Sequence, residues 1–214
     1  MAEREQRPAL VRGDDGARRC WWGQSAPEYI RYHDEEWGWP VTGDDGLFER
    51  LCLEAFQSGL SWLTILRKRD AFRRAFADFR IDAVARFGAR DRKRLMSDAG
   101  IVRNRLKIDA AIENAKAAAA LAAEDGSLSG LIWSFRPKRR RAPRAISDLP
   151  ATTPESDALA RELKVRGFRF VGPTTAYALM QACGLVNDHL SGCVARGPVE
   201  RARREAIARM LPPR

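Results

Sequence analysis

Apolar residues recur along this chain at intervals of three and four positions, the spacing typical of amphipathic helices. Leu47, Leu51 and Ala55 share one face of a helix predicted over residues 46–58, and a longer helix is predicted over residues 104–123. The sequence has no alternating run of apolar and polar positions that is rich in β-branched side chains, so no strand is predicted. The pattern therefore favours an all-α fold.

Capping residues indicate where some of these helices begin. Asp45 is expected to cap the helix over residues 46–58, and Ser61 to cap a short helix that ends near Lys68. Further helical segments are predicted at residues 70–77, 81–86, 90–98, 157–165 and 174–183.

The link between the last two helices has the composition of a tight turn. It begins at Gly167 and reaches Pro173, in the first turn of the second helix, where a missing N–H costs no hydrogen bond. This arrangement resembles a helix-hairpin-helix over about residues 157–183, whose second helix offers free N–H groups to a DNA phosphate. The alternative is an ordinary helical hairpin in a core. The candidate DNA-binding residues here are Gly167, Arg169, Gly172 and Thr174.

Basic residues outnumber acidic ones in this chain of 214 residues. The formal net charge is +10, from 38 Lys and Arg against 28 Asp and Glu. An excess of this size favours a polyanionic partner such as nucleic acid, although a solvated Arg-rich surface would carry the same charge.

The two ends of the chain and one internal loop are polar or basic. Residues 1–18 are predicted to be a disordered polar tail, residues 19–195 the globular domain, and residues 196–214 a basic tail. A loop broken by proline carries the basic run 138–141. Because no apolar run could span a bilayer and no secretory signal is present, we expect a cytoplasmic protein without membrane contact. We also expect a monomer.

The only two histidines each have a cysteine at short range. Cys20 precedes His33 by thirteen positions, and His189 precedes Cys193 by four. Two thiolates and two imidazoles are the donor set of a closed, tetrahedral, structural zinc site, which would join the two ends of the chain. Buried thiols and hydrogen-bonded histidines are the alternative.

A second candidate site combines one acid with large rings. Glu54 lies on the helix over residues 46–58 but off its apolar stripe, and Trp62 follows shortly after. With Trp22, Tyr29 and Tyr32 they could line a pocket for a flat, electron-poor base, because aromatic rings stack on bases and attract cations. The alternative is a core tryptophan beside a solvated glutamate.

Several motifs occur in the order found in one enzyme family. They are Trp22 and residues 29–38 (YIRYHDEEWG), 47–54 (LFERLCLE), 59–62 (GLSW), 98–103 (DAGIVR), 166–172 (RGFRFVG) and 180–189 (MQACGLVNDH). Together they cover about residues 19–193 and resemble the bacterial type I 3-methyladenine DNA glycosylases. The resemblance implies a helix-hairpin-helix glycosylase fold, with residues 19–195 as the glycosylase domain and a base pocket between two helical lobes. It also implies one structural zinc ion per chain, bound by the residues matching Cys20, His33, His189 and Cys193.

The resemblance assigns roles to single residues. Glu54 matches the carboxylate that hydrogen-bonds the excised base, Trp62 and Tyr32 match its stacking rings, and Trp22 matches another pocket aromatic. Leu60 matches the apolar residue that fills the gap left by the flipped nucleotide. The family's Gly-Gln before this turn is replaced by residues 55–56 (Ala-Phe), which puts the packing beside Glu54 in question.

Other helix-hairpin-helix glycosylases carry an aspartate after the hairpin. Near that place this chain has Asn187 and Asp188, and the sequence leaves open which of them occupies the position. Asp188 is predicted to orient His189 at the metal site.

The implied reaction is excision of 3-methyladenine from double-stranded alkylated DNA by hydrolysis of the N-glycosidic bond, which releases the free base in base excision repair. No lysine follows Lys164, so the amine nucleophile of a lyase step is absent after the hairpin and a monofunctional enzyme is predicted. The alternative from another class is a non-catalytic, zinc-stabilised helix-hairpin-helix DNA-binding module. Glu54, Trp62 and Tyr32 argue against it, because a protein that binds only the DNA backbone needs no aromatic pocket with an acid.

Overall fold

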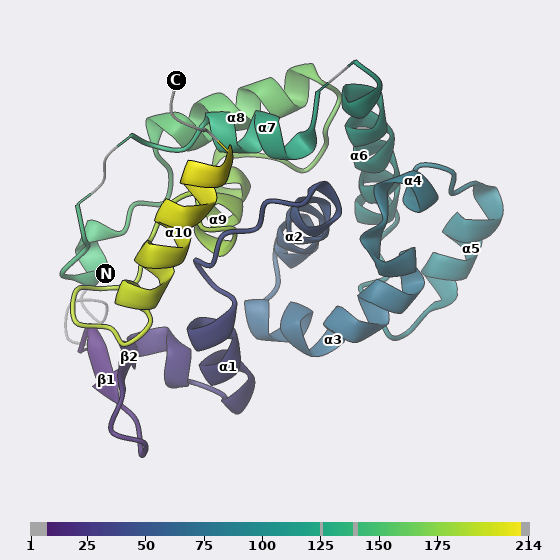
Figure 1. Ribbon diagram of the computed structural model, residues 1–214. Coiled ribbons are helices and arrows are strands. Elements are labelled where there is room, and N and C mark those ends of the chain that lie inside the picture. Colours follow the sequence, from purple (N-terminus) through teal and green to yellow (C-terminus); the bar gives the residue numbers. More distant parts are fainter. Residues whose placement is uncertain (1–7, 125, 139–140, 211–214) are drawn as a thin grey trace. The chain divides into compact units, whose positions relative to one another are not determined.

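The computed structural model describes residues 8–124, 126–138 and 141–210, and most of these residues are helical (Figure 1). The all-α class is therefore confirmed in its coarse form, with one two-stranded antiparallel sheet as the exception. The chain divides into two compact units, each assembled from segments that are distant in sequence. Within the described residues, no helix is both long enough and apolar enough to cross a membrane.

The first unit takes the chain up to Val41, residues Arg136–Ala151, and the chain from Met180 onward. Its elements are β1 (Leu10–Arg12), β2 (Arg18–Cys20), the 3-10 helices Trp21–Gln24 and Ile146–Asp148, α1 (Pro27–Glu35) and α10 (Arg196–Met210). Its core packs Leu190 and Val199 from the end of the chain against Leu10 and Trp39 from its beginning.

The N-terminal segment differs from the disordered tail predicted over residues 1–18. β1 and β2 form an antiparallel hairpin in which Leu10 pairs with Cys20. Arg19 fastens this hairpin, because its guanidinium forms ion pairs with Asp15 at 2.6 Å and with Asp34 at 2.7 Å. Such strands are too short to show an alternating pattern, so tertiary contacts decide their structure. Residues 1–7 lie outside the described part of the chain.

The second unit takes residues Thr42–Phe135 and Thr152–Leu179. Its elements are α2 (Asp44–Gln57), α3 (Trp62–Ala75), the 3-10 helix Ala77–Phe79, α4 (Ile81–Val84), α5 (Ala89–Ser97), α6 (Arg105–Ala123), α7 (Leu128–Ser134) and α8 (Pro154–Val165). α9 (Pro173–Ala182) begins in this unit and ends in the first. A cluster of buried phenylalanines forms much of the core, with the rings of Phe76 and Phe79 stacked at 5.4 Å.

The Ala-Phe pair at residues 55–56, which replaces the family's Gly-Gln, is accommodated by the packing of Phe56. Its ring is fully buried and packs against Phe72 at 4.6 Å between centroids and against Phe76 at 5.8 Å. The side chain that departs from the family pattern is therefore part of a packed aromatic core beneath α2.

Side-chain caps set the helix starts, and one of them was assigned to the wrong helix. Ser61 caps α3 as predicted, since its Oγ accepts from Thr64 N at 3.2 Å. Asp45 instead accepts from Ile81 N at 2.8 Å, and so caps α4 rather than its own helix. Asp44 accepts from Ser129 N at 2.8 Å at the start of α7. Both carboxylates satisfy N–H groups of helices far along the chain, which local spacing does not reveal.

Four helices depart from the sequence prediction. α1 and α7 were not predicted, and the segments expected at residues 61–68 and 70–77 join into the single helix α3. α10 replaces the N-terminal part of the basic tail predicted over residues 196–214. It is held to the first unit because Val199 and Ala206 are buried and because Arg203 donates to the carbonyl of Leu185 at 2.7 Å. Residues 211–214 lie outside the described part of the chain.

Candidate functional site

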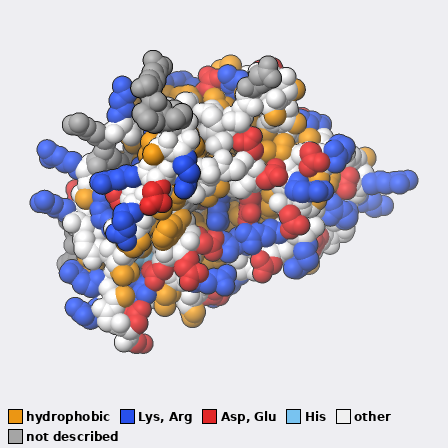
Figure 2. All heavy atoms as spheres, in the orientation of Figure 1, with side chains coloured by type: hydrophobic (Ala, Val, Ile, Leu, Met, Phe, Trp, Pro, Cys, Tyr) orange, Lys and Arg blue, Asp and Glu red, His pale blue; other side chains and the backbone are white. Residues whose placement is uncertain are grey.

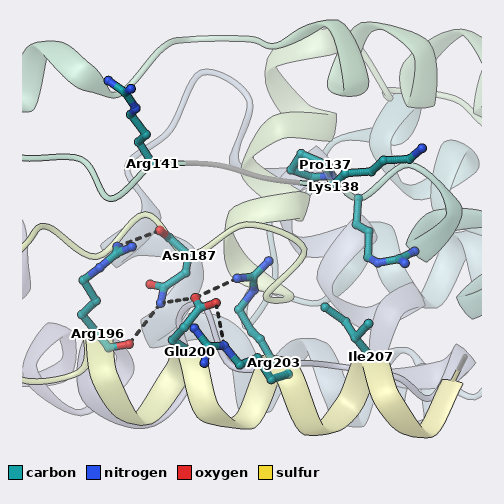
Figure 3. Close-up of a pocket in the computed structure, with 10 residues that line it drawn as sticks. Pro137, Lys138, Arg141, Asn187, Arg196, Glu200, Arg203 and Ile207 are labelled. Carbon is teal, nitrogen blue, oxygen red and sulfur yellow. Dashed lines mark hydrogen bonds and ion pairs between the residues drawn. The ribbon is translucent and has the colours of Figure 1, made fainter. Parts of the chain in front are cut away.

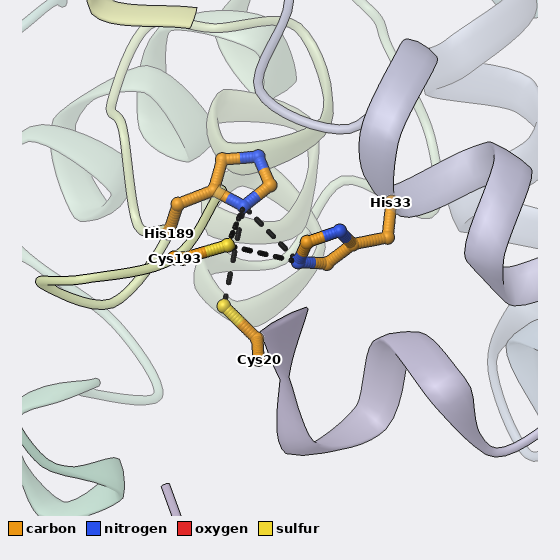
Figure 4. A group of neighbouring side chains, drawn as sticks. All are labelled: Cys20, His33, His189 and Cys193. Atoms are coloured by element: carbon orange, nitrogen blue, oxygen red, sulfur yellow. Dashed lines mark hydrogen bonds between the residues drawn. The ribbon is translucent and has the colours of Figure 1, made fainter. Parts of the chain in front are cut away.

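The four residues expected to hold a metal come together inside the first unit. Cys20 ends β2, His33 lies on α1, and His189 and Cys193 lie on the loop before α10, where all four are buried (Figure 4). One donor atom from each lies within 4.8 Å of the others. His33 Nε2 is 3.4 Å from Cys193 Sγ and 3.2 Å from His189 Nδ1.

The hydrogen bonds around the two histidines set their tautomers. His33 Nδ1 is 2.7 Å from a carboxylate oxygen of Asp34, and His189 Nε2 is 2.9 Å from the carbonyl oxygen of Trp37. Both oxygens accept, so each of these nitrogens carries the proton of its neutral ring. The other two nitrogens then direct lone pairs at each other and at Cys193 Sγ, which is 3.4 Å from His33 Nε2 and 3.6 Å from His189 Nδ1. These nitrogens and the two cysteine sulfurs converge as a donor set for a cation, so this group can hold a metal ion.

The Cys193 thiol has the lowered pKa that metal binding needs, whereas the pKa of Cys20 is raised by its hydrogen bond with Cys193 and by burial. The pKa of the Cys193 thiol is lowered by hydrogen bonding to Cys20 and then to the imidazoles of His189 and His33. Leu190 N also donates to Cys20 Sγ at 3.4 Å. Thiolates are the metal-binding form of cysteine, so these contacts favour the same site. Within the described residues, all four cysteines are buried free thiols.

Asp188 does not orient His189 as the sequence analysis predicted. Both ring nitrogens of His189 are engaged, one by Trp37 and one within the metal group, while Asp188 Oδ2 accepts from Gln181 at 2.9 Å. Asn187 faces α10, where its Nδ2 donates to Glu200 at 3.1 Å. Asp34 and Trp37 are the orienting partners. The sequence signal for Asp34 was its place next to His33.

An aromatic cluster adjoins the metal group in the same unit. The ring of Trp22 lies 5.7 Å from that of Tyr29, 6.2 Å from Tyr32 and 5.1 Å from His33. The structure therefore brings together three of the predicted base-binding rings. Trp37, which the prediction left out, lies 4.9 Å from Trp22 and also contacts His189 at 4.8 Å.

Glu54, Leu60 and Trp62 belong to the second unit. The Glu54 side chain is buried on α2, and burial raises the pKa of its carboxyl to about 8 against the opposing charge of Arg50. The alternative of a solvated glutamate is therefore wrong. A buried carboxyl that is largely neutral at pH 7 is the kind of group that functional sites contain.

Lys107 holds the turn between Glu54 and Trp62. This buried α6 side chain donates from Nζ to the carbonyl oxygens of Phe56, at 2.9 Å, and Ser58, at 2.5 Å, where α2 ends. Burial lowers the pKa of the Lys107 amine. The next residues are exposed up to Leu60, whose side chain is 41% accessible, and Trp62 then begins α3. The sequence signal for this contact was a lysine on the buried face of a long predicted helix.

Asn114 holds the hairpin between α8 and α9 in a similar way. It is fully buried on α6, accepts from Arg169 N at 2.7 Å and donates to Arg169 O at 3.1 Å. Gly167 has φ +87°, a left-handed conformation that glycine adopts without strain, and it follows directly after the cap of α8. The hairpin is therefore anchored at its middle by a side chain of another helix.

Charge is distributed over the surface of the protein. Figure 2 shows Lys and Arg side chains across the visible face with Asp and Glu side chains between them. Arg169 and Thr174, two of the predicted DNA-binding residues, are exposed.

Comparisons with known proteins agree on one family. The model of the methyladenine glycosylase family matches residues 21–196. DNA-3-methyladenine glycosylase 1 of Escherichia coli (strain K12) is 47% identical over 177 residues, which are 82% of this chain and 95% of the E. coli protein. A crystal structure of 3-methyladenine DNA glycosylase I aligns with TM-score 0.80 and 46% identity, covering 83% of this chain and 99% of that one. A Staphylococcus aureus structure described as the basis of 3-methyladenine recognition gives TM-score 0.78 and 36% identity, covering 82% and 94%.

The helical fold and these comparisons define a DNA glycosylase. This chain belongs to the methyladenine glycosylase family. The predicted enzyme class, a DNA-3-methyladenine glycosylase, is confirmed, and the alternative of a non-catalytic binding module is not supported.

Proposed function

We propose that this protein excises 3-methyladenine from alkylated double-stranded DNA by hydrolysing the N-glycosidic bond, with Glu54 as the group that binds the base. The observation that carries the proposal is the buried Glu54 carboxyl, whose pKa burial raises to about 8, in a chain of the methyladenine glycosylase family. Adenine methylated on N3 is cationic, and its departure from the sugar neutralises it. The site therefore needs to extrude, stack and hydrogen-bond the base rather than supply a strong acid.

Glu54 can distinguish this cation from ordinary adenine. A positive charge beside a carboxyl favours its ionised form, and the carboxylate then accepts hydrogen bonds from the exocyclic amine. Because the base becomes neutral as it leaves, a strong grip on the cation also stabilises the ground state. Glu54 therefore contributes more to selection of the damaged base than to cleavage of the bond.

Aromatic stacking is the second part of the proposed recognition. Trp62 begins α3 behind the Ser61 cap, and Tyr32 is buried in the cluster that Trp22 and Tyr29 form with it. Leu60 is exposed next to Trp62 and is suited to fill the gap in the duplex after the nucleotide has flipped. The product is the free base, without a lyase step, because no lysine follows Lys164 to form a Schiff base.

The metal in the Cys20, His33, His189 and Cys193 group is proposed to be one structural zinc ion per chain. Zinc bonds of about 2.3 Å to sulfur and 2.0–2.1 Å to nitrogen place the ligands of a tetrahedron about 3.3–3.8 Å apart. The donor separations of 3.2 Å between nitrogens, and of 3.4 Å and 3.6 Å between nitrogen and Cys193 Sγ, are close to those edges, and Cys20 Sγ lies slightly farther out, at 4.0 Å from His189 Nδ1. Four protein donors leave no place for a reactive water, so the proposed role of the ion is structural. It joins the two ends of the chain.

The hairpin over about residues 157–183 is proposed to bind the DNA backbone as a helix-hairpin-helix, within a glycosylase domain over residues 19–195 that acts as a monomer. Pro173 starts α9, whose first N–H groups have no partner within their own helix. Gly172 precedes it, and a Cβ at Gly172 would meet no atom within 4 Å, so a phosphate can approach the backbone closely there.

Replacing Gly172 with leucine is expected to weaken binding of undamaged duplex DNA about tenfold, because the side chain blocks one phosphate position. Gly43→Leu is the matched control, since Gly43 also has no atom within 4 Å of an added Cβ and lies outside the hairpin. Fluorescence anisotropy across a salt series measures both. Equal affinities for the two variants would contradict the proposed role of the hairpin.

A base-release assay on methylated duplex DNA tests the proposed function, with single-turnover rates of 3-methyladenine release as the readout. Trp62→Ala is expected to reduce the rate about 5- to 150-fold, which corresponds to about 1–3 kcal/mol of lost stacking. Trp62→Phe keeps an aromatic ring and should retain most of the rate of base release. No release by the unmodified protein would overturn the proposed function, and an unchanged rate in Trp62→Ala would place the stacking surface elsewhere.

A further inference from the structure

A second charged site lies in the first unit, and none of the four metal-group residues lines it. The segment that begins at Arg136 and the helix α10 border a pocket of about 850 Å³ (Figure 3). In Figure 3, Glu200, Arg203 and Ile207 rise from α10, and Pro137 and Lys138 lie across the pocket from the helix. Neither the sequence motifs nor the proposed mechanism uses these side chains.

The lining of this pocket is strongly cationic. One carboxylate, Glu200, stands against six basic side chains, which are Arg136, Lys138, Arg141, Arg196, Arg203 and Arg204. Burial would raise the pKa of Glu200, but hydrogen bonding from Asn187 and the charge of Arg203 hold it below its usual value. Glu200 is therefore ionised and already paired, and the pocket keeps a large positive excess.

Part of this positive charge is held in a fixed position. Arg203 donates to the carbonyl oxygen of Leu185 at 2.7 Å and to Glu200 at 2.9 Å. Arg196 donates to the carbonyl oxygen of Asn187 at 3.0 Å. These guanidiniums form a rigid floor. Lys138 and Arg204 are exposed at the rim, and Arg204 has only a 3.7 Å ion pair with Glu200. A fixed floor with exposed rim cations suits a ligand of repeated negative charge.

We infer that this pocket binds phosphate groups of the DNA backbone, as a contact separate from the hairpin. The match to the methyladenine glycosylase family ends at residue 196, so the side chains that α10 contributes beyond its first residue lie outside the matched region. The inference rests on the proposed function, because DNA is the polyphosphate that such an enzyme meets. Each phosphate neutralised by a basic side chain releases counterions, which makes the contact measurable through salt.

The experiment compares two double variants of the full-length protein. Lys138→Ala/Arg204→Ala removes two rim charges, and Arg201→Ala/Arg209→Ala removes two exposed charges of α10 that do not line the pocket. Undamaged duplex DNA is titrated by anisotropy over a range of salt concentrations. The pocket variant is expected to bind about tenfold more weakly at low salt, with the slope of log K against log salt reduced by about 1–2. The DNA affinity of the control variant should change less than threefold.

Two results would overturn the inference. Equal loss of affinity in both double variants would mean that net charge, and not the pocket, attracts DNA. The second result would come from calorimetry with inorganic pyrophosphate. If the pocket variant no longer bound pyrophosphate but still bound DNA as tightly as the unmodified protein, the pocket would be a site for a small free anion. Single-turnover base release at saturating enzyme is measured in parallel and should be normal in both variants. Absence of release in the unmodified protein would count against the proposed function and leave the affinity comparison valid.

Discussion

Cys193→Ala is expected to lower the zinc content well below one ion per chain and the melting temperature by about 10 °C or more. The metal group joins β2 and α1 to the loop before α10, so its loss separates segments more than 150 residues apart in sequence. Removing one ligand leaves a buried thiol and two facing imidazole nitrogens without their cation. A loss of about 3–5 kcal/mol corresponds to such a shift in a protein of this size.

Cys52→Ala is the matched control, because Cys52 is also a buried free thiol but lies in the second unit, outside the group. This variant should keep its zinc, and its free energy of unfolding should fall only by the small amount expected for a shortened core side chain. Elemental analysis and thermal unfolding, with and without a chelator, check both variants. A protein purified without chelator that contains no metal and melts at the same temperature as Cys193→Ala would refute the zinc proposal.

Glu54→Gln is expected to have opposite effects on stability and on activity. In the folded protein the Glu54 pKa is raised from 4.5 to about 8, so folding is favoured by the protonated form. This contribution is fully present below pH 4.5 and is lost as pH rises to about 8, by about 5 kcal/mol in total. The glutamine variant lacks this loss, so its stability relative to the unmodified protein should rise with pH over that window.

The activity of Glu54→Gln relative to that of the unmodified protein should fall over the same range. Below pH 8, kcat/KM of the unmodified enzyme on methylated DNA should rise about tenfold per pH unit, because the carboxylate form binds the cationic base. The variant should lose this rise, with a smaller effect on the single-turnover rate at saturation than Trp62→Ala produces. Unfolding titrations and pH–rate profiles measure the two effects.

Glu49→Gln is the matched control for Glu54→Gln, since Glu49 lies on the same helix but is ion-paired with Arg73 at 2.9 Å. It should gain no stability at high pH and should keep the pH–rate profile. Parallel stability curves for Glu54→Gln and the unmodified protein between pH 4.5 and 8 would show that the Glu54 carboxyl is not protonated by burial.

The sequence alone determined the helical class, the family and the four residues of the metal group. Helical periodicity is a local property, so the helices over α2, α6 and α8 could be predicted within a few residues. The only two histidines, each near a cysteine, left few ways to build a metal site. The family motifs cover most of the chain, and the match over residues 21–196 confirmed the family.

Only the tertiary structure decided which long-range partner each polar group has. Asp45 caps α4 and not its own helix, His189 is oriented by Trp37 and not by Asp188, and Asn114 anchors the hairpin from α6. The N-terminal hairpin and α10 are ordered by contacts between the two ends of the chain. The burial that raises the pKa of Glu54 is likewise a property of the folded protein. Hydrogen bonds and desolvation depend on distances in space, which the local spacing of residues does not encode.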